Sequence, residues 1–128
     1  MKEKEGEEKN FIISDAGMND LARPSLYGSY QGIMPVKKNE KDLLLADVVG
    51  PICESGDFLA KDRDIPPFKP GDLFAVASAG AYGFTMSSNY NSRVRAAEVM
   101  VKGDTFEVVR DREEFRDLVK GEKIPSFL

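Results

Sequence analysis

The sequence of 128 residues contains no histidine and only one cysteine, Cys53. Without histidine, these residues lack the commonest general base and metal ligand, and every Ser-His or Cys-His mechanism is excluded within them. A single cysteine forms no internal disulfide, which favours a reducing compartment. No apolar run approaches the roughly 20 residues of a membrane-spanning helix, so we expect no membrane partner.

Charge of neither sign dominates. The chain has 18 basic and 22 acidic residues, interspersed, for a net charge of −4. No basic face is evident, so we expect no nucleic-acid partner. The first ten residues are rich in lysine and glutamate and lack the apolar segment of a signal peptide, so we expect a cytoplasmic protein. We also find no metal-ligand cluster, no internal repeat and no Gly-rich phosphate loop before a helix.

Short apolar runs bounded by turn residues predict a mainly β fold. A strand at residues 11–13 would pair with a hairpin arm around Gly6, so the chain is expected to begin in mid-structure. The proline-rich residues 62–71 are expected to form a rigid connection. The other expected strands cover residues 30–36, 42–49, 58–59, 72–78, 96–102 and 105–110.

A short helix is expected near the end of the chain. Asp111 would cap it with Glu114 reaching back, and Gly121 would end it. Its apolar stripe would be Phe115, Leu118 and Val119. The strands and this helix together indicate a single β domain over residues 1–128, built as a small barrel or sandwich.

Cys53 lies where the apolar run of residues 43–49 ends, inside the sequence Gly-Pro-Ile-Cys-Glu-Ser-Gly-Asp. A thiol beside the carboxylate of Glu54 on a constrained loop is typical of a functional site. The alternative is a cysteine that serves as a small buried apolar group, which is the commoner case.

Two further places have side chains suited to binding. Arg23 and Tyr27 share a face if residues 19–27 form a helical turn capped by Asn19 or Asp20, with Pro24 keeping it short. They predict either a carboxylate-binding pair or a surface stack. Tyr82, between two glycines, either contacts a ligand or covers the end of a sheet.

Five motifs together resemble the carboxyl-terminal part of diaminopimelate decarboxylases. They occur in that family's order and cover nearly the whole chain. They are Asp15-Ala-Gly-Met-Asn-Asp-Leu21, Arg23-Pro-Ser-Leu-Tyr27, Cys53-Glu-Ser-Gly-Asp57, Gly80-Ala-Tyr-Gly83 and Ser87-Ser-Asn-Tyr-Asn91.

This resemblance implies a Greek-key-like β domain, also found in alanine racemase, that follows a (β/α)8 barrel holding pyridoxal phosphate. The family's enzymes are homodimers that convert meso-diaminopimelate to L-lysine and CO2. By resemblance, Cys53 would donate a proton across the dimer interface. Glu54 would meet the distal ammonium group of the substrate, Arg23 and Tyr27 would hold its distal carboxylate, and Tyr82 would touch both cofactor and substrate.

The family's Schiff-base lysine and phosphate-binding glycines belong to the barrel, which these residues do not resemble. We therefore expect the 128 residues alone to be inactive and to self-associate through surface that would meet a barrel. Two alternatives remain. One is another decarboxylase of this fold, for arginine or carboxynorspermidine, which Glu54 and the Arg23–Tyr27 pair argue against. The other is a non-catalytic assembly module.

Overall fold

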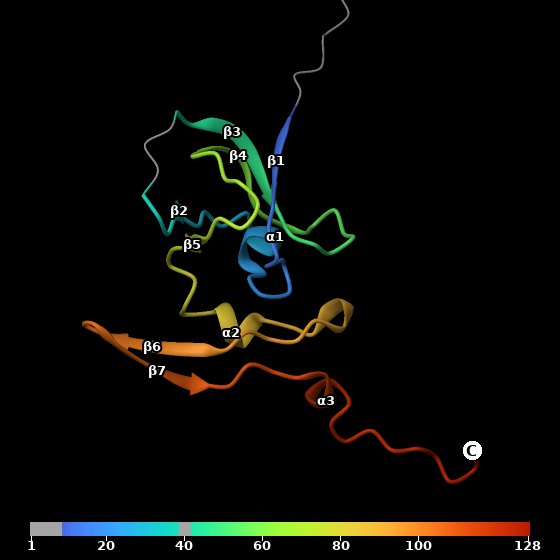
Figure 1. Cartoon of the computed structure of the whole chain (residues 1–128). Helices are drawn as coiled ribbons and strands as arrows, with labels where there is room; N and C mark the ends of the chain where they lie inside the picture. Colours follow the sequence, from blue (N-terminus) through green and yellow to red (C-terminus); the bar gives the residue numbers. More distant parts are fainter. Residues whose placement is uncertain (1–8, 39–41) are drawn as a thin grey trace, which may run out of the picture.

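The computed structural model describes residues 9–38 and 42–128, and their fold is mainly β, as the sequence predicts (Figure 1). The predicted hairpin around Gly6 lies outside the described residues. The strands are β1 (Asn10–Ile13), β2 (Ile33–Pro35), β3 (Leu44–Val49), β4 (Phe58–Ile65), β5 (Phe74–Val76), β6 (Glu98–Lys102) and β7 (Thr105–Arg110). The helices are α1 (Arg23–Tyr27), α2 (Gly83–Met86) and α3 (Phe115–Leu118), with a 3-10 turn at Tyr90–Ser92.

The strands of the described residues pair into three sheets. The largest has the order β1-β3-β4, in which β1 runs parallel to β3 and β3 runs antiparallel to β4. The strand predicted at residues 11–13 is therefore confirmed, with β3 as its partner. An antiparallel pair, β2 and β5, forms the second sheet. The third is the hairpin β6–β7, which matches the hairpin that the sequence predicts around Gly103.

The core is small and centres on the β3–β4 pair. Its buried apolar side chains come mainly from these two strands, with Leu21 added from the segment before α1. Asp47 is buried beside them, where it accepts hydrogen bonds from Lys9 Nζ at 2.9 Å and from the backbone N–H of Asp62 at 2.7 Å. These partners satisfy a carboxylate that would otherwise be costly to bury. The core residues are Leu21, Ala46, Val48, Leu59, Ala60 and Ile65.

Three local predictions are wrong. First, β4 continues to Ile65, although residues 62–71 are predicted to be a connection. A register shift and the left-handed backbone of Asp62 (φ 49°) let the strand bend and still pair with β3. Second, the helical turn predicted over residues 19–27 is shorter than expected and is not capped by Asn19 or Asp20. The helix α1 begins at Arg23 and has Pro24 in its first turn, where the missing N–H costs nothing. Third, α3 is capped by Glu114 and Asp117 in a reciprocal pair, and not by Asp111.

The hairpin β6–β7 lies apart from the main sheet, below α2 in the view of Figure 1. Its apolar side chains are mostly more than half exposed, including Met100 at 64 % and Phe106 at 71 %. Phe115 of the predicted stripe on α3 is likewise 72 % exposed. Apolar surface of this extent is typical of a protein contact surface.

In the described part of the chain, no helix has the length and apolar character needed to cross a bilayer. Within the same residues, no group of histidine, cysteine and acidic side chains is arranged to hold a metal ion.

Candidate functional site

Asp57 ties together the loops around which the candidate site is built. It ends the connection of residues 50–57 between β3 and β4, and its side chain is buried. Its Oδ1 accepts a hydrogen bond from the N–H of Met18 at 2.7 Å, and its Oδ2 accepts one from Ile52 at 2.5 Å. One carboxylate therefore holds the β3–β4 loop in shape and joins it to the segment of residues 14–22 that precedes α1.

Two glycines are required where these segments meet. A Cβ added to Gly50 would lie 2.6 Å from the Cα of Gly17, and one added to Gly17 would lie 2.6 Å from Asp57 Oδ1. Real Cβ atoms do not make contacts this short, so only glycine permits the two backbones to approach.

Cys53 and Glu54 lie on the exposed side of the same loop. The interpretation of Cys53 as a small buried apolar group is therefore wrong, because its thiol is accessible. The carboxylate of Glu54 accepts a hydrogen bond from the hydroxyl of Tyr90 at 3.3 Å.

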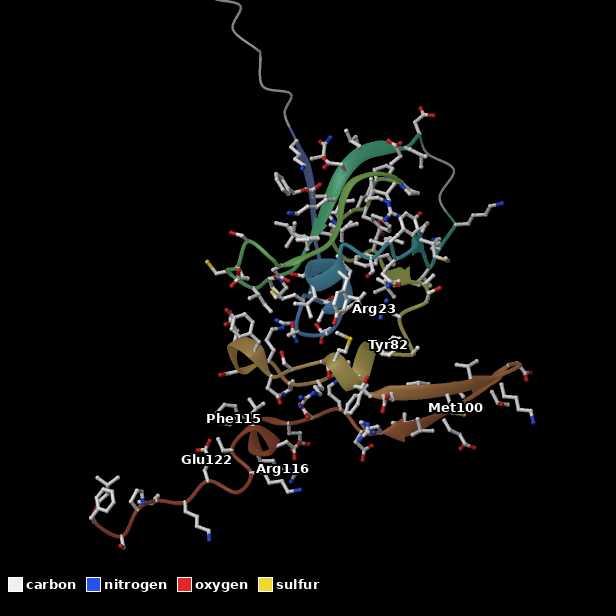
Figure 2. All side chains as sticks on the ribbon, turned by 180° about the vertical axis from the view of Figure 1, so that it is seen from behind. Arg23, Tyr82, Met100, Phe115, Arg116 and Glu122 are labelled. Carbon is white, nitrogen blue, oxygen red and sulfur yellow. The ribbon has the colours of Figure 1, made fainter. Side chains whose placement is uncertain are left out.

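The second group of predicted site residues centres on Arg23, which lies close to Tyr82 in Figure 2. The guanidinium carbon of Arg23 lies 5.7 Å from the ring centre of Tyr27 and 4.8 Å from that of Tyr82. Both rings are more than half exposed. The prediction that Arg23 and Tyr27 share a face of a short helix is confirmed.

Stacking on two rings restrains the Arg23 side chain without using its N–H groups. Among the described residues, its guanidinium makes no hydrogen bond or ion pair. A guanidinium restrained by two rings, with its N–H donors unused, suits a carboxylate, which it binds through two parallel hydrogen bonds. The chemistry of this cluster therefore favours an acidic ligand.

The two groups of site residues do not share a pocket. Glu54 lines a pocket with Leu26 and Tyr90, and Arg23, Tyr27 and Tyr82 are not among the residues that line it. Within residues 9–38 and 42–128, no hydrogen bond, ion pair or ring contact joins Cys53 or Glu54 to Arg23, Tyr27 or Tyr82. One chain thus presents two separate sets of functional groups.

The turn around Tyr82 fits the edge of a cofactor site. A Cβ added to Gly80 or Gly83 would meet no atom within 4 Å, so the space beside this turn is open. The phenol of Tyr82 is exposed and can donate a hydrogen bond to a bound group. These features fit contact with pyridoxal phosphate from one side, while the described residues here offer no enclosed cradle for it.

A polar network holds the segment of residues 87–95. Arg95 donates to Ser87 Oγ at 2.9 Å, to Asn89 Oδ1 at 2.6 Å and to Glu113 Oε1 at 2.8 Å. Glu113 Oε2 also accepts hydrogen bonds from the Arg95 backbone N–H at 2.8 Å and from the Asn89 side chain at 2.7 Å. The backbone hydrogen bond from Arg95 chiefly lowers the pKa of Glu113, with the side-chain bonds adding to it against the opposing effect of burial.

Sequence reasoning missed the parts played by Asp57 and Tyr90. Both lie within the quoted motifs, yet neither was singled out. The signal for Asp57 is its position: it is an acidic residue directly before a buried strand, where backbone N–H groups need acceptors. No local signal connects Tyr90 to Glu54, because the contact depends on how three loops meet.

Comparison with known proteins places this geometry in context. The profile of the pyridoxal-dependent decarboxylase C-terminal sheet domain matches residues 1–80. A diaminopimelate decarboxylase from Aquifex aeolicus is 55% identical over 112 residues, which are 88% of this chain and 27% of that protein. Another, from Archaeoglobus fulgidus, is 50% identical over 94% of this chain and 29% of its own length.

A solved structure has the same fold. The crystal structure of the Helicobacter pylori diaminopimelate decarboxylase complexed with L-lysine superposes with a TM-score of 0.81 at 45% identity, covering 88% of this chain and 28% of that one. The chain thus spans a little over a quarter of the length of the relatives it matches.

Proposed function

The chain belongs to the pyridoxal-dependent decarboxylase family, whose C-terminal sheet domain it matches, and we propose that it supplies this domain to a diaminopimelate decarboxylase. Such an enzyme converts meso-2,6-diaminopimelate to L-lysine and CO2. The relatives that support this proposal carry that name, and one of them was crystallised with L-lysine.

The observation that carries the proposal is the contact of the Arg23 guanidinium with the rings of both Tyr27 and Tyr82. The substrate has a carboxylate at its far end, beyond the carbon that reacts. We assign that carboxylate to the Arg23 guanidinium, with Tyr27 holding the guanidinium in place and adding a phenol. The far end also carries an ammonium group, which we assign to Glu54.

Cys53 is the proposed proton donor. After CO2 leaves, the reacting carbon needs a proton, and an exposed thiol provides one: its S–H bond breaks, a C–H bond forms and a thiolate remains. Pyridoxal phosphate, when bound, supplies the electron sink that makes loss of CO2 feasible. Tyr82 would contact that cofactor through its hydroxyl, while the rest of the cofactor site would come from a barrel domain.

The separation of the two groups supports a homodimer. Because Glu54 shares neither a pocket nor a contact with Arg23 and Tyr82 in one chain, a single chain does not bring both groups to one substrate. A second copy removes the conflict when each active site takes Arg23 and Tyr82 from one chain and Cys53 and Glu54 from its partner.

The exposed apolar side chains of β6, β7 and α3 are the proposed contact surface for the barrel domain or for the second copy. Without that cover we expect the 128 residues to self-associate, and we place the assembled enzyme in the cytoplasm.

The experiment that tests the proposal uses a joined enzyme. In it, residues 1–128 replace the matched region of the Aquifex aeolicus relative and are fused to the unmatched remainder of that protein. We expect the joined enzyme to release lysine and CO2 from meso-diaminopimelate, and residues 1–128 alone to release neither. Activity on arginine or carboxynorspermidine in place of diaminopimelate would overturn the substrate assignment. A folded joined enzyme with no decarboxylase activity would instead favour an assembly module.

A further inference from the structure

Tyr90 is the one aromatic side chain among the described residues that forms a hydrogen bond with a proposed substrate group of the β3–β4 loop. We infer that it is a positioning residue that holds Glu54 for the distal ammonium group of the substrate, and so sets selectivity for that group. This inference rests on the role proposed for Glu54. The contact itself is the hydrogen bond from the Tyr90 hydroxyl to Glu54 Oε2, at 3.3 Å.

Two loops reach this contact from a common base, the segment of residues 14–22. The β3–β4 loop is bound to that segment by Asp57, through the N–H of Met18. The segment of residues 87–93 is bound to it by Ser88, whose N–H donates to the Asn19 carbonyl at 2.9 Å. Because both loops are fixed to one base, the positions of the phenol and the carboxylate are coupled.

The Tyr90 segment is also held from its other side. The network of Arg95, Asn89 and Glu113 fixes the residues on either side of the 3-10 turn. Within that turn, Asn91 and Ser92 both have a φ of 56°, in the left-handed region that non-glycine residues seldom occupy. Backbone in this conformation persists where surrounding contacts over-determine it, and such places cluster at functional sites.

The contact lies in an open pocket that a substrate group can enter. Glu54 and Tyr90 line one pocket whose other walls include Met18, Leu26 and Met86. Both Glu54 and Tyr90 are exposed, so a substrate can reach the carboxylate from solvent. A phenol that fixes one oxygen leaves the other free for an ammonium group.

The inference is tested with the Tyr90→Phe variant of the joined enzyme. Phenylalanine keeps the ring in the pocket and removes only the hydroxyl. We expect KM for meso-diaminopimelate to rise about fivefold with kcat nearly unchanged, because a hydrogen bond to a charged group is lost. The inhibition constant of 2-aminopimelate, which lacks the distal amine, is expected to stay at the parent value.

Controls separate positioning from a structural effect. Tyr30→Phe, at an exposed tyrosine that stacks on Arg63, should match the parent in both constants. In a Glu54→Gln background, Tyr90→Phe should cause no further rise in KM. Equal changes for diaminopimelate and 2-aminopimelate, or no change for either, would overturn the inference.

If the proposed function is wrong, the joined enzyme without the Tyr90 substitution forms no lysine, which is distinct from the outcomes above. The contact is then tested directly on residues 1–128 by NMR. A nuclear Overhauser effect between the Tyr90 ring and the Glu54 side chain supports the placement, and its absence in a folded chain contradicts it.

Discussion

The guanidinium carbon of Arg23 lies 4.8 Å from the centre of the Tyr82 ring, although α1 supplies one residue and the segment before α2 supplies the other. With Tyr27 on the same guanidinium, the contact joins two motifs that are far apart in the sequence. This pairing is the strongest structural support for a carboxylate-binding site.

Replacing Arg23 with lysine tests that site. Lysine keeps the charge but lacks the planar group that binds a carboxylate through two parallel hydrogen bonds. We expect kcat/KM of the joined enzyme for meso-diaminopimelate to fall about 100-fold. Arg116→Lys, at an exposed arginine of α3, should retain the parent value. A fall of less than about threefold for Arg23→Lys would contradict the assignment.

The Asp57→Asn variant tests the junction of the loops. An amide cannot accept both backbone N–H groups as the carboxylate does, and its own NH2 would face a donor. We expect the free energy of unfolding to fall by about 3 kcal/mol, measured by urea denaturation. The exposed Asp72, which caps a turn through the N–H of Lys69, provides the control: Asp72→Asn should cost less than about 1 kcal/mol. Equal losses would show that the Asp57 junction is not special.

Acid should weaken the network around Glu113. Its pKa is lowered in the folded chain from an ordinary value of 4.5, so below that value the unfolded chain takes up the proton first. The stabilisation is present above pH 4.5 and is lost as the pH falls through the lower, folded pKa. We expect Glu113→Gln to reduce stability at neutral pH and to flatten the decline below pH 4.5. Thermal unfolding across that range, with Glu122→Gln as the control, measures the difference.

Much of the fold could be predicted because its strands are local patterns. The hairpin β6–β7 and the strand β3 follow from alternation, apolar content and turn residues. The parallel pairing of β1 with β3 could not be predicted, because it joins segments that no short turn connects. The bend at Asp62 depends on pairing across the sheet and not on the proline content nearby.

The candidate site, like the fold, could be predicted only in part from the sequence. The residue types of the Cys53 loop and of α1 predict functional roles, and resemblance to a family suggests a role for each. The arrangement required coordinates: the sequence contains no sign that Arg23 meets Tyr82, that Tyr90 meets Glu54, or that the two groups do not share a pocket. These contacts arise where loops meet, and loop packing depends on the whole domain.

The central claim is that Arg23 and Cys53 of one chain serve two different active sites of a dimer. The direct test is a mixed dimer of the joined enzyme that pairs an Arg23→Ala chain with a Cys53→Ala chain, isolated through two affinity tags. Each variant alone should be nearly inactive. In the mixed dimer one site carries both changes and the other carries neither, so we predict about half of the parent rate of lysine formation. A mixed dimer as inactive as the two single variants would place both residues in one chain's site and would contradict the account.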